Sequence, residues 1–184
     1  DVSQLPRAAV ASLNSTQLKA LPASSAVGIS SNQISAIASS VFRTISSAMI
    51  QMISGEAFGG LLPNQVASLV PTQLRVLTAD QLGAIDPSSI GSFSANQIKA
   101  IAPDAFSGLV SEQLAALTAK SVFGLTAPQA KILLPEEIDG LMAKHIKSLP
   151  ANVFASLSVL QISSLSKPAA NGVTPAQLKL LSDQ

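Results

Sequence analysis

A large apolar residue recurs at every eighth position along the whole chain, from Leu5 to Leu181. A fixed short period of this kind indicates that one small structural unit is stacked many times, so the architecture of the chain follows from the unit. We number the octads so that the recurring residue is the eighth position, as in TADQLGAI at 78–85 and VSEQLAAL at 110–117.

The fifth position of the octads is apolar as well, for example Leu82, Ile98 and Leu114. Positions five and eight share one face of an α-helix, whereas a spacing of three places them on opposite faces of a strand. One continuous helix is excluded because the apolar pair would drift by about 80° per octad on a 3.6-residue period. The pattern therefore predicts that each octad forms its own short helix.

Proline and glycine mark where each helix begins and ends. All 11 prolines fall in the first three positions of an octad, where a helix tolerates them, and a proline in the interior would break it. Of the 10 glycines, nine stand at position six or seven, near the end of the unit. We interpret these glycines as sites where the backbone needs unusual dihedral angles.

Alternate octads differ, which gives a superperiod of sixteen residues. One type carries glutamine at position four, and most of these octads begin with Ser, Thr or Asn, so the pair predicts a capping box at the helix start. The other type begins with proline more often and supplies phenylalanines at position five, so we expect the two helix types to face different neighbours. The glutamines are Gln17, Gln33, Gln65, Gln81, Gln97, Gln113, Gln129, Gln161 and Gln177.

These observations predict an all-α solenoid, a superhelix of about twenty short helices with two or three residues between them. Helices of one or two turns are unstable alone, so stacking on neighbouring units must hold them. The octads continue through 1–184, which we interpret as a single domain and as a fragment of a longer array, or as a chain that associates end to end. Local irregularities are expected at 54–63, where two glycines, Gly59 and Gly60, are consecutive, and at 166–173, where the turn-forming dipeptide Asn171-Gly172 occurs.

The octads TADQLGAI, VSEQLAAL and TPAQLKLL, alternating with proline-led units such as APDAFSGL, resemble the short-helix superhelical repeats of the mesothelin, stereocilin and otoancorin family. The resemblance spans the whole chain at the level of this pattern. It implies an extracellular or cell-surface protein without enzymatic activity, used in adhesion or in attachment to a matrix.

Composition and motifs argue against several function classes. Eleven basic and ten acidic side chains leave a net charge of +1, which favours neither nucleic acid nor an anionic membrane surface as a partner. No apolar run approaches the roughly 18 to 20 residues that cross a bilayer, and cysteine is absent, so disulfides and thiolate metal sites are excluded. No common catalytic or nucleotide-binding motif occurs, so we predict no catalytic, cofactor-binding or metal site.

Few residues carry chemistry. His145 stands in the position otherwise filled by glutamine, so we interpret it as a polar capping residue in place of a catalytic base or metal ligand. Glu136, Glu137 and Asp139 are the only clustered carboxylates, and a calcium or acid/base site would require convergent ligands from elsewhere. Asn14 begins a glycosylation sequon that a secreted chain could use.

Five lysines repeat at position six of the glutamine-type octads, and we expect them to share one face: Lys19, Lys99, Lys131, Lys147 and Lys179. They form either a solvated face or a ridge that binds an anionic polymer. The function that the sequence favours is a non-enzymatic extracellular structural or adhesive repeat module, whose partners are other copies of itself, extracellular matrix or another protein. The alternative is a solenoid that binds an anionic polysaccharide, an ice-like surface or a protein partner.

Overall fold

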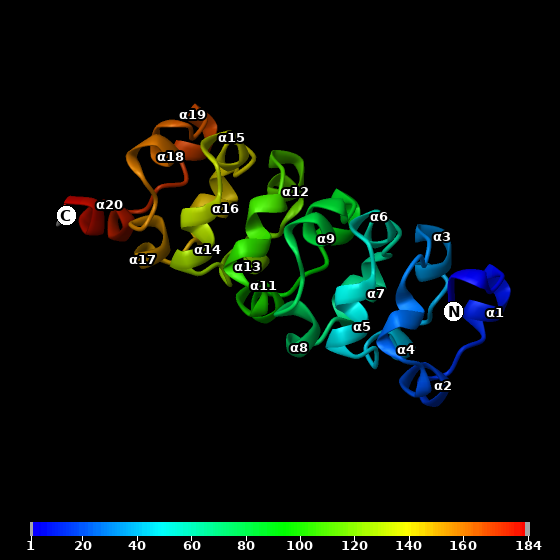
Figure 1. Cartoon of the computed structure of the whole chain (residues 1–184). Helices are drawn as coiled ribbons and strands as arrows, with labels where there is room; N and C mark the ends of the chain where they lie inside the picture. Colours follow the sequence, from blue (N-terminus) through cyan, green and yellow to red (C-terminus); the bar gives the residue numbers. More distant parts are fainter. Residues whose placement is uncertain (1, 183–184) are drawn as a thin grey trace.

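The computed structural model describes residues 2–182, and these form only helices: the α-helices α1–α20 and the 3-10 helices η1–η3. They are arranged as an elongated coil, with α1 and α20 at opposite ends (Figure 1). The predicted all-α superhelix of short helices is confirmed. Connections of two residues mostly alternate with connections of four, slightly longer than the sequence predicts.

Each helix contacts the helices three octads before and after it, so the coil stacks its helices in three columns. Column A contains α1 (Arg7–Ala11), α3 (Ser31–Ile34), α6 (Gly55–Phe58), α9 (Ala79–Ala84), η3 (Pro103–Gly108), α14 (Ala127–Ile132), α17 (Ala151–Phe154) and α20 (Pro175–Ser182). Column B contains α2 (Ser15–Ala20), α4 (Ser39–Phe42), α7 (Pro63–Ser68), α10 (Pro87–Ile90), α12 (Ser111–Ala116), α15 (Pro135–Ile138) and α18 (Val159–Ser163). Column C contains η1 (Val2–Gln4), η2 (Ala23–Ala26), α5 (Ser47–Met52), α8 (Pro71–Leu74), α11 (Ala95–Ala100), α13 (Ala119–Val122), α16 (Ala143–Ser148) and α19 (Lys167–Ala170).

The columns wind around the long axis of the coil. Along the upper edge of Figure 1, α3 and α6 belong to column A, whereas α12 and α15 belong to column B. The segments 54–63 and 166–173, where the sequence predicts irregularity, contain α6 and α19, and both helices contact their column neighbours.

The two helix types occur in every column. Most glutamine-type octads form helices of six residues, such as α9 and α11, and most of the others form helices of four residues or 3-10 helices. Because three is odd, a contact between helices three octads apart always joins one type to the other. The two types therefore have different neighbours, as expected, but neither type lines a side of the coil by itself.

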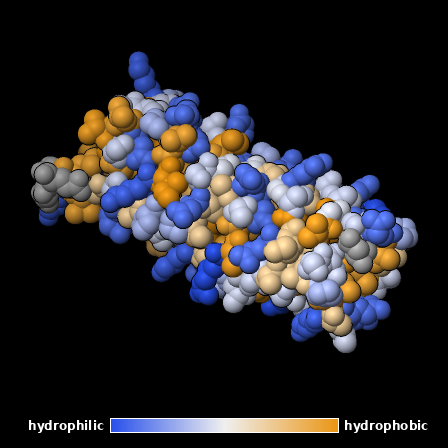
Figure 2. Space-filling model, in the orientation of Figure 1, coloured by the Kyte–Doolittle hydropathy of each residue, from blue (hydrophilic) through white to orange (hydrophobic). Residues whose placement is uncertain are grey.

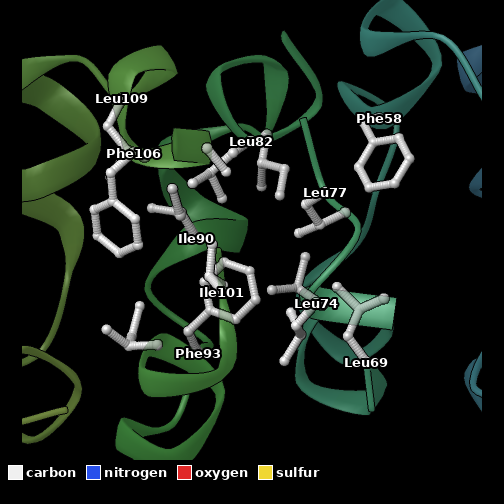
Figure 3. Packing of buried hydrophobic residues seen from close by; sticks show 14 of the residues in the cluster. Phe58, Leu69, Leu74, Leu77, Leu82, Ile90, Phe93, Ile101, Phe106 and Leu109 are labelled. Atoms are coloured by element: carbon white, nitrogen blue, oxygen red, sulfur yellow. The ribbon is translucent and has the colours of Figure 1, made fainter. Parts of the chain in front are cut away.

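The core is a continuous strip of the apolar residues at positions five and eight. Every one of these residues from Ala26 to Leu157 is buried. Figure 3 shows part of the strip, in which side chains of successive turns pack against one another, with Phe58, Phe93 and Phe106 among the largest. Removing a side chain of this size from water contributes about 1.5–3 kcal/mol. Burial decreases towards both ends of the described chain, where Leu5 and Leu178 are exposed. Stacking between turns therefore supplies what a helix of four to six residues lacks alone.

Most of the predicted capping boxes are present, although the Thr126 side chain makes no capping hydrogen bond. In α9, the Thr78 hydroxyl accepts a hydrogen bond from the Gln81 backbone N–H at 3.2 Å, and the Gln81 side-chain oxygen accepts one from the Thr78 N–H at 3.1 Å. The same reciprocal pair occurs at Asn14, Ser30, Ser94 and Ser158. The sequence-based interpretation of position four is therefore confirmed for the start of each such helix.

The amide of the same glutamine also joins one turn of the coil to the turn before it. The buried Gln81 side chain donates from Nε2 to the Ile50 and Ile53 carbonyl oxygens, both at 2.7 Å. Together with the capping bond, these bonds use the side-chain oxygen and both amide hydrogens of Gln81. We call the glutamines that make this bond the cross-turn glutamines: Gln33, Gln65, Gln73, Gln81, Gln97, Gln113, Gln129, Gln161 and Gln177. They reach 28 and 31 residues back, whereas helices stack three octads apart, so one turn contains between three and four octads.

The glycines serve close approach between turns more than unusual dihedral angles. Among the described residues only Gly28 has a positive φ, at 76°. A Cβ atom on Gly108, Gly124 or Gly140 would lie 2.0 Å from a carbonyl oxygen of the preceding turn. The interpretation of these glycines from sequence is thus corrected: they allow backbone to pass backbone, which no larger residue permits.

Candidate binding surface

The five lysines that the sequence places on one face are divided among the three columns. Lys99 and Lys147 belong to column C, on α11 and α16, whereas Lys131 and Lys179 belong to column A and Lys19 to column B. The reason is the mismatch between two periods, because glutamine-type octads recur every two octads and a column recurs every three. The predicted single ridge is therefore not brought together in one column.

Stacking in threes produces a different and stronger sorting of charge. The described octads of column C contain six basic residues and no acidic one, and all six are exposed. Column B has the opposite balance, with two basic and five acidic residues, and column A carries three of each. The six basic residues of column C are Arg75, Lys99, Lys120, Lys144, Lys147 and Lys167.

At the middle of the basic part of column C, which runs from α8 to α19, one phenylalanine faces solvent. Phe123 directly follows α13 and is 63% exposed, whereas Phe42, Phe58, Phe93, Phe106 and Phe154 are all buried. It occupies position six of its octad, the position at which Lys99 and Lys147 stand one turn before and one turn after it. An exposed aromatic ring in a line of cations is not required by the repeat, whose buried positions are five and eight.

Phe123 stands between two open hollows on the surface. One, of about 480 Å³, is also lined by Lys99, Pro128, Pro150 and Asn152. The other, of about 520 Å³, is lined by Lys120 and Lys147 as well as the same phenylalanine. The helices α11, α13 and α16 follow one another along the middle of the coil in Figure 1, and the second hollow lies on these three turns. The first hollow lies between column C and column A, to which Pro128, Pro150 and Asn152 belong. We call Phe123, Lys99, Lys120 and Lys147 the Phe123 patch.

Among residues 2–182, no other aromatic side chain is exposed. Figure 2 shows hydrophilic side chains between apolar ones along the face in view. Exposed apolar residues such as Val159 and Leu160 lie near the C-terminal turns, and the second of these lines a hollow with Leu134 and Lys131. The Phe123 patch therefore combines an aromatic ring with three cations from one column.

His145 is buried and takes the place of a cross-turn glutamine in α16. Its Nδ1 accepts a hydrogen bond from the Met142 N–H at 3.1 Å, so Nε2 carries the proton and donates to the Leu117 carbonyl at 2.8 Å. Burial lowers the pKa of His145 and the neighbouring Lys144 lowers it further, while the Leu117 hydrogen bond acts in the opposite direction. The predicted capping role is confirmed, and the ring also links two turns.

Glu137 fills the equivalent position in α15. Its Oε2 accepts a hydrogen bond from the Leu134 N–H at 2.7 Å, so the helix start is capped as in the glutamine octads. A carboxylate has no N–H to donate to the preceding turn. Burial raises the pKa of Glu137, the Leu134 hydrogen bond lowers it, and Glu136 raises it. Its role in the coil is therefore capping, and the acidic cluster with Glu136 and Asp139 lies along column B.

Sequence reasoning missed both the cross-turn bonds and the Phe123 patch. A signal for the first was present, because capping boxes use glutamate as readily as glutamine, yet position four carries glutamine ten times and glutamate once. Only the amide supplies donors as well as an acceptor. The signal for the second was a lack of acidic residues in every third octad from residue 22 onward, which becomes visible once the stacking number is known.

No protein-family model matches the chain, and no curated protein is similar to it in sequence. Over residues 2–182, no group of three or more histidine and carboxylate side chains is placed to hold a metal ion. Within the same range no helix has both the length and the apolar character of a membrane span.

Proposed function

We propose that this chain is a non-enzymatic structural and adhesive repeat module that works outside the cell or at its surface. The observation that carries the proposal is the commitment of buried polar side chains to the coil itself. The cross-turn glutamines, Ser89, Ser121 and His145 all bond to the backbone of the preceding turn. A coil held in this way at nearly every turn is suited to keep one shape and to hold other groups apart.

The resemblance of the octads to the mesothelin, stereocilin and otoancorin repeats supports the extracellular and adhesive part of this proposal. The partners that it names are matrix or cell-surface proteins and a second copy of the chain. Exposed Leu178, at 56%, and Leu5 favour an end-to-end contact between copies, because their equivalents in the middle of the coil are covered by the next turn. Sedimentation over a range of concentrations tests that contact, which requires a concentration-dependent increase in mass.

Display of the chain on non-adherent cells tests the adhesive role. We expect cells that carry the folded chain to attach to matrix-coated surfaces under flow. Cells that display equal amounts of a Gly108→Val variant, whose coil cannot close against the preceding turn, should detach. Equal retention of the two cell lines, or none of either, contradicts the proposal. Scattering from the purified chain should in addition give the dimensions of a single stiff rod.

A further inference from the structure

We propose that column C is a binding track for a linear anionic polysaccharide, and that the Phe123 patch is its central subsite. The proposal rests on the proposed extracellular function for the class of ligand, and otherwise on the charge and shape of this column. It differs from the ridge that the sequence suggests, because three of those five lysines lie in other columns and four cations outside that set belong to the track: Arg75, Lys120, Lys144 and Lys167.

The charge of the track is concealed in the nearly neutral composition of the chain. Packed helices lie about 10 Å apart, so cations on successive turns of column C are separated by about one Debye length at physiological salt. Their potentials therefore reinforce one another along the column. No residue of the described column C octads carries a negative charge to cancel this potential. A flexible polyanion gains one electrostatic contact per turn on such a surface, with release of its counterions.

The Phe123 patch gives the track a site with shape. Each of the two hollows beside the ring has the size of a small-ligand pocket. The C–H face of a sugar ring is apolar and can cover the exposed phenyl ring, which buries surface that is otherwise in water. Lys99 and Lys147, in separate hollows, can then each meet a sulfate or carboxylate on either side of the covered sugar.

The arrangement favours a polysaccharide over single-stranded nucleic acid. Proteins that bind single strands stack successive bases on several aromatic side chains within a basic groove. Column C offers one exposed aromatic ring in its described octads and five lysines with a single arginine. Charged groups held at wide spacing, with one apolar contact, match a chain of sugars that bears sulfates or carboxylates along its length.

The test uses heparin as the probe and two triple variants of equal charge. The first changes the patch, Lys99→Gln, Lys120→Gln and Lys147→Gln. The matched control changes three cations of the other columns, Lys19→Gln, Arg43→Gln and Lys131→Gln. Lysine and glutamine have similar helix propensities, so both variants should fold. We expect the patch variant to bind heparin on the order of 10- to 100-fold more weakly than the unchanged chain at physiological salt, and the control to lose less than about threefold.

The dependence on salt and the aromatic ring give two further readouts. The slope of the logarithm of affinity against the logarithm of salt concentration should become shallower by roughly two in the patch variant. Phe123→Ala should weaken binding about fivefold without changing that slope, because the removed contact is uncharged. Circular dichroism of each variant checks that the helices are retained.

Several results would overturn the inference. These are no retention on heparin at low salt, equal losses in the two triple variants, or a preference for single-stranded DNA over heparin at equal charge. None of them bears on the cell-attachment test, which can be run on matrix treated to remove its anionic polysaccharides. Attachment without heparin binding would leave the adhesive function standing, and heparin binding without attachment would leave only the track.

Discussion

Columns B and C have the same interior and opposite surfaces. In both, apolar residues at positions five and eight are buried and cross-turn side chains fasten helices to the preceding turn, as at Gln113 in column B and Gln73 in column C. Outside, column B is predominantly acidic and column C entirely basic. The two columns show that the residues that determine the fold and the residues that set the surface charge repeat with different periods. The fold is specified every eight residues, whereas the surface charge is organised every twenty-four.

The largest expected effect removes the close approach that both columns share. Gly124→Ala in column C and Gly140→Ala in column B each place a Cβ atom 2.0 Å from a backbone oxygen of the preceding turn, at Ala95 and Ser111. Because backbone must move in both cases, we expect each variant to lose roughly 4 kcal/mol of unfolding free energy. Urea denaturation of the two proteins provides the measurement.

Gly59→Ala is the control for that pair. Its Cβ would lie 3.2 Å from the Glu56 oxygen and 3.3 Å from the Ala84 oxygen, contacts that small shifts relieve. The loss of stability should be several times smaller. If Gly124→Ala and Gly140→Ala differed widely from each other, the idea of one common interior would be wrong.

The second effect removes a cross-turn bond from each column. Gln73→Met and Gln113→Met keep the length of the side chain, and Met49 already occupies the same position in α5, so the shape is accommodated. Each change removes the acceptor of a partly buried backbone N–H and the amide donor to a buried carbonyl, that of Ile45 or Ile85, for which we expect a loss of about 2–3 kcal/mol. Hydrogen exchange should increase most in the two turns that the lost bond joined. Gln17→Met, at an exposed capping box, should cost less.

A third experiment exploits the one carboxylate in the cross-turn position. The pKa of Glu137 is raised in the folded chain, so folding binds extra protons and stability falls as pH rises from 4.5 through the raised pKa. Glu137→Gln supplies the missing donors and removes that fall, so we expect a gain of about 1 kcal/mol at neutral pH and none below pH 4. Thermal unfolding at a series of pH values decides this, and a gain independent of pH would contradict the assignment.

His145 gives the opposite pH response one octad later, in column C. Its pKa is lowered in the folded chain, so the unfolded chain takes up the proton first and stability falls as pH decreases below 6.5. His145→Gln should retain both hydrogen bonds of the ring and abolish this loss, with little change at pH 8. If the free energy of unfolding of His145→Gln still decreased between pH 6.5 and the lowered pKa, another group would be responsible for the loss.

The smallest effect concerns the charges that distinguish the columns. Lys147→Gln in column C and Asp139→Asn in column B change exposed side chains, and we expect each to alter the free energy of unfolding by less than about 0.5 kcal/mol. Denaturation curves that coincide with that of the unchanged chain would show that the surface is free to vary without cost to the fold. A loss above 1 kcal/mol would mean that the two surfaces contribute to the coil.

The sequence predicted the local structure well because local rules decide it. The capping box of Thr78 and Gln81 depends on residues three apart, and the burial of Leu82 and Ile85 follows from their spacing on one short helix. It failed where a residue acts on a distant segment. The second use of the Gln81 amide, on Ile50 and Ile53, and the close approach of Gly108 to Ala79 both require knowledge of which turn lies alongside.

The candidate site shows the same limit. Lys99 and Lys147 were found from their place in the octad, but Lys120 and Phe123 were not, because they join the other two only across stacked turns. The His145 capping role was read correctly from its position, whereas its bond to Leu117, 28 residues away, was not.

The sequence by itself determined that this chain forms a series of short capped helices and which two residues of each are hidden from water. An octad with apolar residues at positions five and eight, a polar start and proline near its beginning can satisfy its backbone and bury its stripe in only one local conformation. The tertiary structure alone decided that helices stack three octads apart. That number depends on the angle between successive helices, which is set by the packing of large side chains in the core and by how closely the glycine backbones can pass. Because this angle stacks helices three octads apart rather than two, the cations of every third octad come together in one column.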